Sequence, residues 1–349
     1  MFLRTGLFAG IAAGIFGIGL SSMAVPAAAQ SVADFYKGKR LSIYVGSTTG
    51  GGYDAYARHV ARHIGRLLPG APDTVVMNMP GGGGLKVTNY LYSVAPKDGT
   101  ALGTLQRGML TAPLLEARTE NNAFQPQKFN WLGSLNTETG VIISSTAAPH
   151  KTMDDLFKTE LIVGSSGPST DFLPLFLNNV IGTKFKIVQG YQSSTEAYLA
   201  LERGEVQGRV SGGWTGDRKT VEPWHAAGKV RYLAVVSLKA SGYFPGLPLV
   251  TQYAKTDEQK QVMELILSSQ LWGRPFTMPP GVPSDRVAAM RKAFGDLTKD
   301  KEFVAEAEKL KLDLELVDGA EIDAIMARVY ATPASVVEVA RKAIGANVK

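Results

Sequence analysis

The chain has 349 residues, a formal net charge of +6 and no cysteine. The lack of cysteine excludes thiol catalysis, thiolate metal sites and haem attached through sulfur. Basic residues are scattered among acidic ones rather than gathered into the stripe that nucleic-acid binding needs, so we expect no nucleic acid as a partner.

The first 29 residues have the features of an export signal. Arg4 supplies the positive start, residues 6–20 form an uncharged apolar stretch, and Ala27 to Ala29 offer small residues for cleavage before Gln30. The apolar stretch is shorter than the roughly 20 residues that a membrane span needs. We therefore expect cleavage of residues 1–29 and a soluble mature chain in the periplasm, with enough residues for two domains.

The start of the mature chain alternates strand and helix patterns. The expected elements are strands at 41–46, 74–79 and 101–105 and helices at 53–68 and 85–94. The first helix is the clearest, because Ala57, Val60 and Ile64 recur at helical spacing on one face. Strand, turn, helix and strand in this order are typical of a parallel sheet with right-handed crossovers.

A second alternating set follows, and helices close the chain. The second set has expected strands at 141–144, 161–164, 186–188, 206–210 and 230–236 and helices at 171–181 and 194–203. Ser284 is expected to cap a helix that carries Val287 to Leu297, and further helices are expected at 301–311, 320–329 and 334–344. Two similar sets predict an α/β fold with two lobes.

Three turns join a strand to a helix and attract attention as binding loops. They are the glycine turns at 50–54 and 80–84 and the serine/glycine turn at 165–170. Glycines let a ligand approach the backbone, and free N–H groups at a helix start attract anions. Ligands of parallel α/β sheets bind beyond the carboxyl ends of the strands. The glycines could instead serve only tight turns, but three turns in equivalent places favour binding.

Two motifs suggest other chemistry. Gly50, Gly52 and Ala55 fit a dinucleotide fingerprint, but the second strand ends without the acidic residue that this fingerprint expects. His59 and His63 have the spacing of a zinc pair without an obvious third ligand. We expect them on the solvated side of the helix and predict no metal and no cofactor.

The remaining polar residues do not demand an enzyme. No serine lies in a G-x-S-x-G motif, and Asp54 precedes Arg58 by four residues, which favours a helix ion pair. His150 and His225 are expected to be exposed. Trp214, in the glycine-rich stretch 211–217, either covers a ligand or packs over its own loop. Arg209 and Arg218 flank that stretch and are candidate partners for a carboxylate, although strand-end arginines are more often solvated.

Several stretches together carry a family resemblance. They are YKGKRLSIYVGSTTGGGYDAYAR at 36–58, VVMNMPGGGG at 75–84, APKDGT at 95–100, the loop at 164–170, GKVRYLAVVS at 228–237 and PPGVPSDRV at 279–287. In this order they resemble the periplasmic solute-binding proteins of tripartite tricarboxylate transporters, the Bug-type family.

The resemblance implies a class II periplasmic binding protein fold, with two α/β lobes and a cleft between them. It implies lobe one at 31–138 plus 274–349 and lobe two at 139–273, although the second crossing can lie tens of residues earlier. It also implies that backbone N–H groups, hydroxyls and water hold the ligand's carboxylates. The sequence differs from the usual family pattern at 46–50, where many members carry Pro or Ala, and at Gly82, where Ala is usual. The ligand of a relative therefore cannot be assigned to this protein.

We expect a monomeric protein that binds a small anionic ligand, a carboxylate, and delivers it to integral membrane transporter subunits without acting as an enzyme. The alternatives are a sensor subunit for a membrane receptor and a periplasmic hydrolase that uses a loop serine. The predicted ligand-binding residues are Thr48, Thr49, Gly51, Gly52, Asp54, Gly82, Gly83, Gly84, Ser165, Ser166, Ser169, Thr170, Tyr191, Trp214 and Asp217.

Overall fold

The computed structural model describes residues 30–116, 124–165, 168–191 and 193–346. Contacts divide the chain into Met1–Ser31 and Val32–Lys349, and the second unit carries everything described below. The predicted signal peptide at 1–29 lies outside the described residues. Within the described ranges, no helix combines the length and the apolar character that crossing a membrane requires.

The first of two sheets has six strands. They are β1 (Arg40–Val45), β2 (Asp73–Asn78), β3 (Ala101–Thr104), β4 (Asn130–Ser134), β10 (Pro275–Met278) and β11 (Val317–Asp318). Their order across the sheet is β11-β4-β10-β3-β1-β2. Strands β2, β1 and β3 are parallel, as the sequence predicts, whereas β10, β4 and β11 pair antiparallel and were not predicted.

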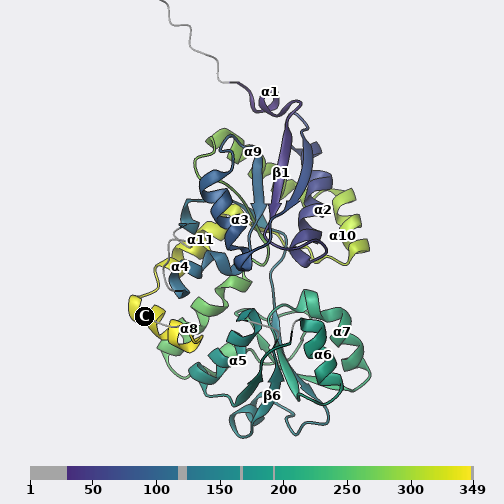
Figure 1. Cartoon of the computed structure of the whole chain (residues 1–349), viewed down its shortest axis with the longest axis vertical. Coiled ribbons are helices and arrows are strands. Elements are labelled where there is room, and N and C mark those ends of the chain that lie inside the picture. Colours follow the sequence, from purple (N-terminus) through teal and green to yellow (C-terminus); the bar gives the residue numbers. More distant parts are fainter. Residues whose placement is uncertain (1–29, 117–123, 166–167, 192, 347–349) are drawn as a thin grey trace, which may run out of the picture. The chain divides into compact units, whose positions relative to one another are not determined.

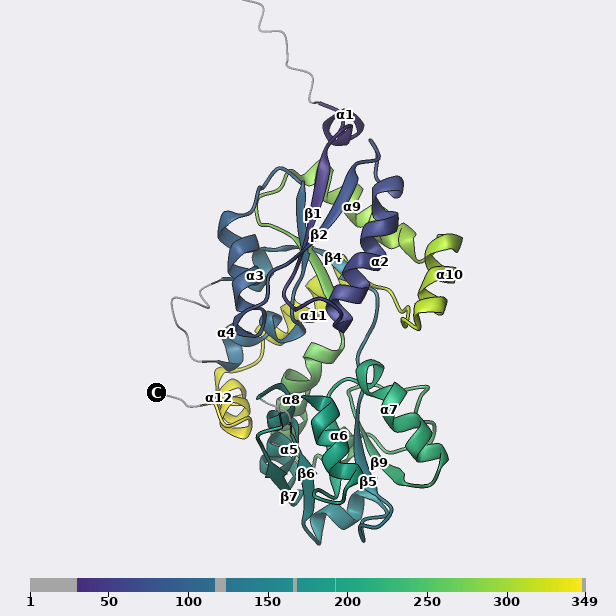
Figure 2. The ribbon, with the colours of Figure 1, turned by 45° about the vertical axis from the view of Figure 1, so that its right-hand side comes forward.

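Two layers of helices cover this sheet. The helices are α1 (Val32–Tyr36), α2 (Gly52–Leu67), α3 (Leu85–Asn89), α4 (Ala112–Leu115), α9 (Ser284–Leu297), α10 (Lys301–Leu310) and α11 (Gly319–Tyr330). Side chains alternate between the faces of a strand, so Leu41 and Ile43 pack with α2 and α9 while Tyr44 packs with α3. Figures 1 and 2 show α3 and α2 on opposite faces of β1.

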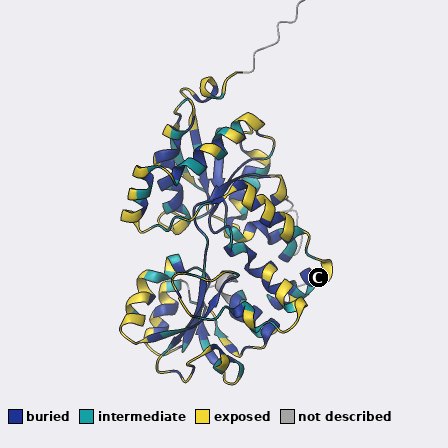
Figure 3. Ribbon diagram, turned by 180° about the vertical axis from the view of Figure 1, so that it is seen from behind, coloured by how far each residue is buried: buried dark blue, intermediate teal, exposed yellow. Residues whose placement is uncertain are grey.

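The second sheet has five strands, all close to their predicted positions. They are β5 (Gly140–Ser145), β6 (Leu161–Gly164), β7 (Phe185–Val188), β8 (Gly208–Ser211) and β9 (Val230–Val236), in the order β7-β6-β8-β5-β9. Its helices are α5 (Pro168–Ile181), α6 (Ser194–Glu202), α7 (Trp214–Ala226) and α8 (Asp257–Leu267). Ile142 faces the core shared with α5 and α8, whereas Val141 and Ile143 face α6 and α7. Figure 3 shows the strands buried and the outer helix faces exposed.

The chain passes between the sheets twice. It leaves the first sheet after β4 and enters the second at β5, and it returns between β9 and β10. The helix α12 (Ala334–Ala343) follows the last strand of the first sheet but packs against α5 and α8 beside the second sheet. The exact lobe boundaries, 31–138 plus 274–349 and 139–273, stay a prediction.

Three local expectations are wrong. Ser284 is the first residue of α9 and makes no capping hydrogen bond, because Pro283 occupies the N-cap position. His150 is fully buried, with its Nε2 at 3.0 Å from the Thr159 hydroxyl. His59 and His63 are 0% and 7% exposed rather than solvated, because α10 packs over that side of α2.

Candidate functional site

One edge of each sheet collects the ends of its strands. In the first sheet, Val45, Asn78 and Thr104 end β1, β2 and β3 in register, and β4 ends beside the start of β10. In the second sheet, β6, β7, β8 and β9 end at the edge where β5 begins. Residues 135–139 run directly from one edge to the other. The loops at both edges therefore face the region where ligands of α/β proteins bind.

The two glycine turns of the first sheet lie against each other. A Cβ at Gly46 would lie 2.8 Å from Val87 and 3.4 Å from Gly84. Asn78 joins the turns, since its amide donates to the Ser47 carbonyl at 3.0 Å and its Oδ1 accepts from Thr49 at 3.3 Å. This edge thus brings together the predicted ligand residues of both turns, which are Thr48, Thr49, Gly51, Gly52, Gly82, Gly83 and Gly84.

Asp54 serves the first turn itself. Its carboxylate is 2% exposed and accepts hydrogen bonds from the Gly50 N–H at 2.8 Å, from Arg58 at 2.9 Å and from the Asn78 amide at 2.8 Å. Burial raises the pKa of Asp54, but these hydrogen bonds outweigh burial and lower it. The predicted ion pair with Arg58 is confirmed at 2.9 Å, and most of the carboxylate's bonding capacity is already used.

The loops of the second sheet are less completely described. Ser165 is 1% exposed, and its N–H donates to the Val188 carbonyl at 2.9 Å. Tyr191 lies nearby, since a Cβ at Gly164 would be 3.3 Å from its ring. The backbone of Ser169 and Thr170 lies in the first turn of α5. Ser166 lies outside the described residues.

Arg209 lies beneath these loops and is buried rather than solvated. It is 1% exposed, its Nη2 donates to the Ser194 hydroxyl at 2.8 Å, and its guanidinium lies 4.9 Å from the Tyr198 ring. Arg218 is half-buried on α7 and pairs with Asp313 at 3.5 Å. Both candidate cations of the sequence therefore have partners within the protein.

Trp214 begins α7 instead of standing on an exposed loop. It is 2% exposed and packs against Phe244 and Tyr232, with ring centroids 4.8 and 5.5 Å apart. Asp217, one turn later, accepts a hydrogen bond from the Ser211 hydroxyl at 2.6 Å. The structure thus favours packing over the open, ligand-covering loop for Trp214, although its side chain still lines a cavity.

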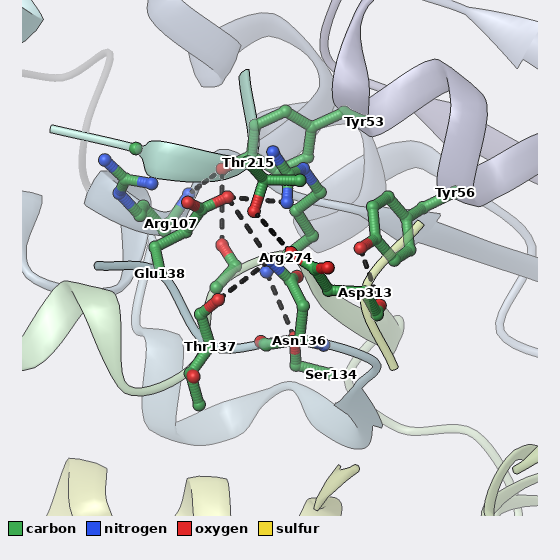
Figure 4. A network of polar contacts seen from close by, with 12 residues as sticks. Tyr53, Tyr56, Arg107, Ser134, Asn136, Thr137, Glu138, Thr215, Arg274 and Asp313 are labelled. Atoms are coloured by element: carbon green, nitrogen blue, oxygen red, sulfur yellow. Dashed lines mark hydrogen bonds and ion pairs between the residues drawn. The ribbon is translucent and has the colours of Figure 1, made fainter. Parts of the chain in front are cut away.

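A buried ion pair occupies the connection between the sheets (Figure 4). Arg274, at the start of β10, pairs with Glu138 at 2.6 Å, and both residues are less than a tenth exposed. The guanidinium lies 4.9 Å from the ring of Tyr56 and 5.5 Å from that of Tyr53. A Cβ at Gly52 would lie 2.9 Å from Arg274 Nη2, so this glycine makes room for a protein side chain.

Arg107 follows β3 and reaches across to the second sheet. Its backbone N–H donates to the Tyr53 hydroxyl at 2.9 Å, and its Nη2 donates to the Gly212 carbonyl at 2.7 Å. Its side chain is half-buried, and across the described part of the chain it forms an ion pair with no carboxylate. A guanidinium has five N–H donors, so Arg107 keeps donors for an anion.

Beside this network lies a cavity of about 420 Å³. Its lining includes Trp214 and Tyr243 from the second-sheet side and Asp313 and Glu315 from the first-sheet side. Among the described residues, four buried polar atoms of its lining side chains have no hydrogen-bond partner: Asn136 Oδ1, Glu138 Oε2, Trp214 Nε1 and Gln270 Oε1. Buried polar atoms normally have a hydrogen-bond partner, so these four atoms are candidates for hydrogen bonds to water or to a solute in the cavity.

No protein-family model matches the sequence, and no curated protein matches it. Solved structures do match. A TctC solute-binding protein from Polaromonas, solved with no ligand, has a TM-score of 0.67 and 18% identity, over 87% of this chain and 99% of that chain. The periplasmic binding protein BugD gives 0.60 and 20%, over 88% and 98%. MatC from Rhodopseudomonas palustris, with bound malate, gives 0.59 and 18%, over 85% and 99%.

The chain has the periplasmic binding protein fold. The predicted fold class, two α/β lobes of the class II type, is confirmed. The chain covers nearly the full length of each of these neighbours, so both sheets of the periplasmic binding fold are present here.

The residues that connect the two sheets of the periplasmic binding fold were not predicted. Arg107 lies three residues after the end of β3, where a strand was predicted at 101–105. Ligands bind beyond the carboxyl ends of such strands, so the position of Arg107 could have marked it as a site residue. The pairing of Arg274 with Glu138 gave no such signal, because the two residues are far apart in the chain and meet only through the paired ends of β4 and β10.

Proposed function

We propose that the protein is an exported solute-binding protein that captures a small carboxylate and delivers it to integral membrane subunits of a tripartite tricarboxylate-type transporter. The observation that carries this proposal is the pair of facing strand edges, with glycine turns on one side and a cation, Arg107, that forms no ion pair with a carboxylate of the described chain. The full-length likeness to TctC, BugD and malate-bound MatC supports it.

The chemistry of the edges suits an anion. The turn at 81–84 holds four glycines with positive φ, a backbone path that side chains would obstruct. Free N–H groups at the start of α2 and Arg107 are donors for carboxylate oxygens. Asp54 and Asn78 hold the turns in shape rather than contributing charge to the solute.

The two predicted lobes would close over the solute. Residues 135–139 and the return segment before β10 are the connections about which such a motion turns. A solute shifts the balance between open and closed forms only by its differential affinity for the closed one. In this proposal the closed surface is what the membrane subunits recognise, and the protein acts as a monomer in the periplasm.

A thermal-shift screen tests the proposal. A ligand at 100 times its dissociation constant adds about 2.7 kcal/mol to stability, so a binding acid should raise the melting temperature by several degrees. The panel contains malate and other di- and tricarboxylates, amino acids and neutral sugars. A shift with sugars and none with any acid contradicts carboxylate capture.

Arg107→Gln gives the residue-level prediction. Removing a charged hydrogen-bond donor from a carboxylate costs about 1.5–3 kcal/mol, so affinity for the acid found in the screen should fall at least about tenfold. Titration calorimetry of both proteins measures the change. The matched control is Arg203→Gln, because Arg203 is exposed and pairs with Glu205 at 3.7 Å on the surface. An unchanged affinity in Arg107→Gln removes Arg107 from the site.

A further inference from the structure

A second polar cluster lies away from the strand edges, between α2 and α10. It contains His59 and His63 from α2 and Glu306 from α10. One ligand atom from each of the three residues lies within 4.8 Å of the other two. Two imidazoles and one carboxylate form a common protein ligand set for zinc, with a fourth position left for water.

His59 is the least explained residue of the cluster. It is 0% exposed, it stacks on Phe303 with ring centroids 3.9 Å apart, and among the described residues neither of its ring nitrogens makes a hydrogen bond of good geometry. Its Nδ1 lies 3.4 Å from Glu306 Oε2.

His63 and Glu306 complete the set. His63 Nε2 lies 2.5 Å from Glu306 Oε2, the same oxygen that faces His59. Arg62 pairs with the other oxygen, Oε1, at 2.7 Å. The carboxylate is therefore fixed from outside, and its second oxygen points toward both imidazoles.

Two neighbouring arginines must be weighed against a cation. Arg62 pairs with Glu306, and Arg66 pairs with Asp300 and Glu302. Two guanidinium groups thus stand against three carboxylates, which leaves one net negative charge beside the two imidazoles. The local charge balance therefore favours a divalent cation despite the arginines.

The proton on His63 also has a destination. Arg66 donates to Nδ1 at 2.9 Å, so Nε2 carries the proton in the absence of metal. Binding through Nε2 requires the proton on Nδ1, so the Arg66 guanidinium that donates to Nδ1 has to turn away. Asp300 lies within 4.8 Å of a His63 ring nitrogen, but both of its oxygens accept hydrogen bonds from Arg66, so it can accept from Nδ1 only after Arg66 turns away. A carboxylate behind a ligating histidine is the usual second support of a zinc site.

We propose that His59, His63 and Glu306 bind one divalent transition-metal ion of the zinc class, which joins α2 to α10. The site is separate from the strand edges, so the proposal does not depend on the nature of the solute. Because α2 begins at the first glycine turn, the ion would fix the helix on which that turn is built.

The test is a titration of the mature protein with Co²⁺ as a visible probe, followed by competition with Zn²⁺. The protein must carry no histidine tag, because a tag binds the same ions. We expect one equivalent of Co²⁺ with the absorption of a four-coordinate site and its displacement by Zn²⁺. In Glu306→Gln and His63→Gln the dissociation constant should rise at least about tenfold.

Two control variants locate the ion. His225→Gln removes an exposed histidine outside the cluster and should leave the titration unchanged. Glu302→Gln changes an exposed carboxylate that meets His63 and Asp300 but not His59. Wild-type protein that binds no stoichiometric Co²⁺ overturns the proposal, and so does a loss in Glu302→Gln that matches the loss in Glu306→Gln.

Discussion

Gly52 is a residue whose neighbours explain its identity. It lies in a turn that was predicted to face a ligand, yet the space beside it is filled by the Arg274 guanidinium, 2.9 Å from where a Cβ would be. The ion pair with Glu138 prevents that guanidinium from moving away freely. We expect Gly52→Ala to lower the free energy of unfolding by about 1–3 kcal/mol, the usual cost of overpacking, measured by urea denaturation.

Gly216 provides the comparison for this variant. It also lies near the start of a helix, but nothing lies within 4 Å of its Cβ position. Gly216→Ala should therefore leave stability unchanged or raise it by up to about 1 kcal/mol. Equal effects of the two substitutions would show that Arg274 does not restrict Gly52.

Asp300 contributes to the way in which the stability of the protein falls at acidic pH, the acid limb of its stability profile. Hydrogen bonds from Arg66 and from the Phe303 N–H lower its pKa from 3.8 to about 2. Because the folded pKa is depressed, this contribution is complete above the unfolded value of 3.8 and is lost as the pH falls toward about 2. We expect Asp300→Asn to flatten the fall of stability in that window, measured by chemical denaturation at stepped pH.

Asparagine keeps the N-cap of α10, so the variant isolates the charge. Asp323 gives a control of opposite sign, because burial raises its pKa. A group with a raised folded pKa loses stability as the pH rises, so Asp323→Asn should not flatten the acid limb. An unchanged slope in Asp300→Asn would contradict the depressed pKa.

Residues close in sequence were the predictable ones. The pairing of Asp54 with Arg58 follows from helical spacing and was found. The burial of His59 was not predictable from α2 alone, because Phe303 and Glu306 cover it from a helix more than 240 positions later. The contact between Gly52 and Arg274 could not be predicted for the same reason, because the two residues are far apart in the sequence.

At the scale of elements, the parallel strands and their helices were predicted because each carries its own apolar pattern. The strands β4, β10 and β11 were missed, since they are short and depend on antiparallel partners far along the chain. Helix α7 was missed for another reason. It contains Gly216 and Pro223 and buries only Trp214 and Val221, so it has no apolar stripe.

Helix α7 offers a reporter through its first residue. Trp214 Nε1 is buried, unpaired and part of the lining of the 420 Å³ cavity. A solute or reordered water at that nitrogen should change tryptophan emission, and the change should shrink in Trp214→Phe. Trp131 and Trp272, which are fully buried, and Trp224, which is half-buried, supply the background. A full-sized change in Trp214→Phe would place the responding tryptophan elsewhere.

At the scale of the molecule, solute-driven closure should be visible in solution scattering. Saturation with the acid found in the thermal screen should reduce the radius of gyration of the mature protein, because the loops at the facing edges approach each other. Ala substitution of Asp313, which accepts hydrogen bonds from Thr215 at 3.1 Å and Tyr243 at 2.5 Å, should expand the solute-free protein. Superimposable profiles with and without solute contradict hinge closure.

The contacts of Asp313 affect the balance between the open and closed forms that the proposed function requires. This carboxylate, on the side of the first sheet, directly contacts three side chains from the side of the second sheet: Thr215, Tyr243 and Arg218. In the proposed function, every such bond favours the closed form of the protein, with or without solute. In the proposed function these bonds would raise the affinity for the solute, and they would also raise the closed fraction of the solute-free protein. Under the proposed function, Asp313 would therefore decide how much solute-free protein presents the closed surface to the membrane subunits.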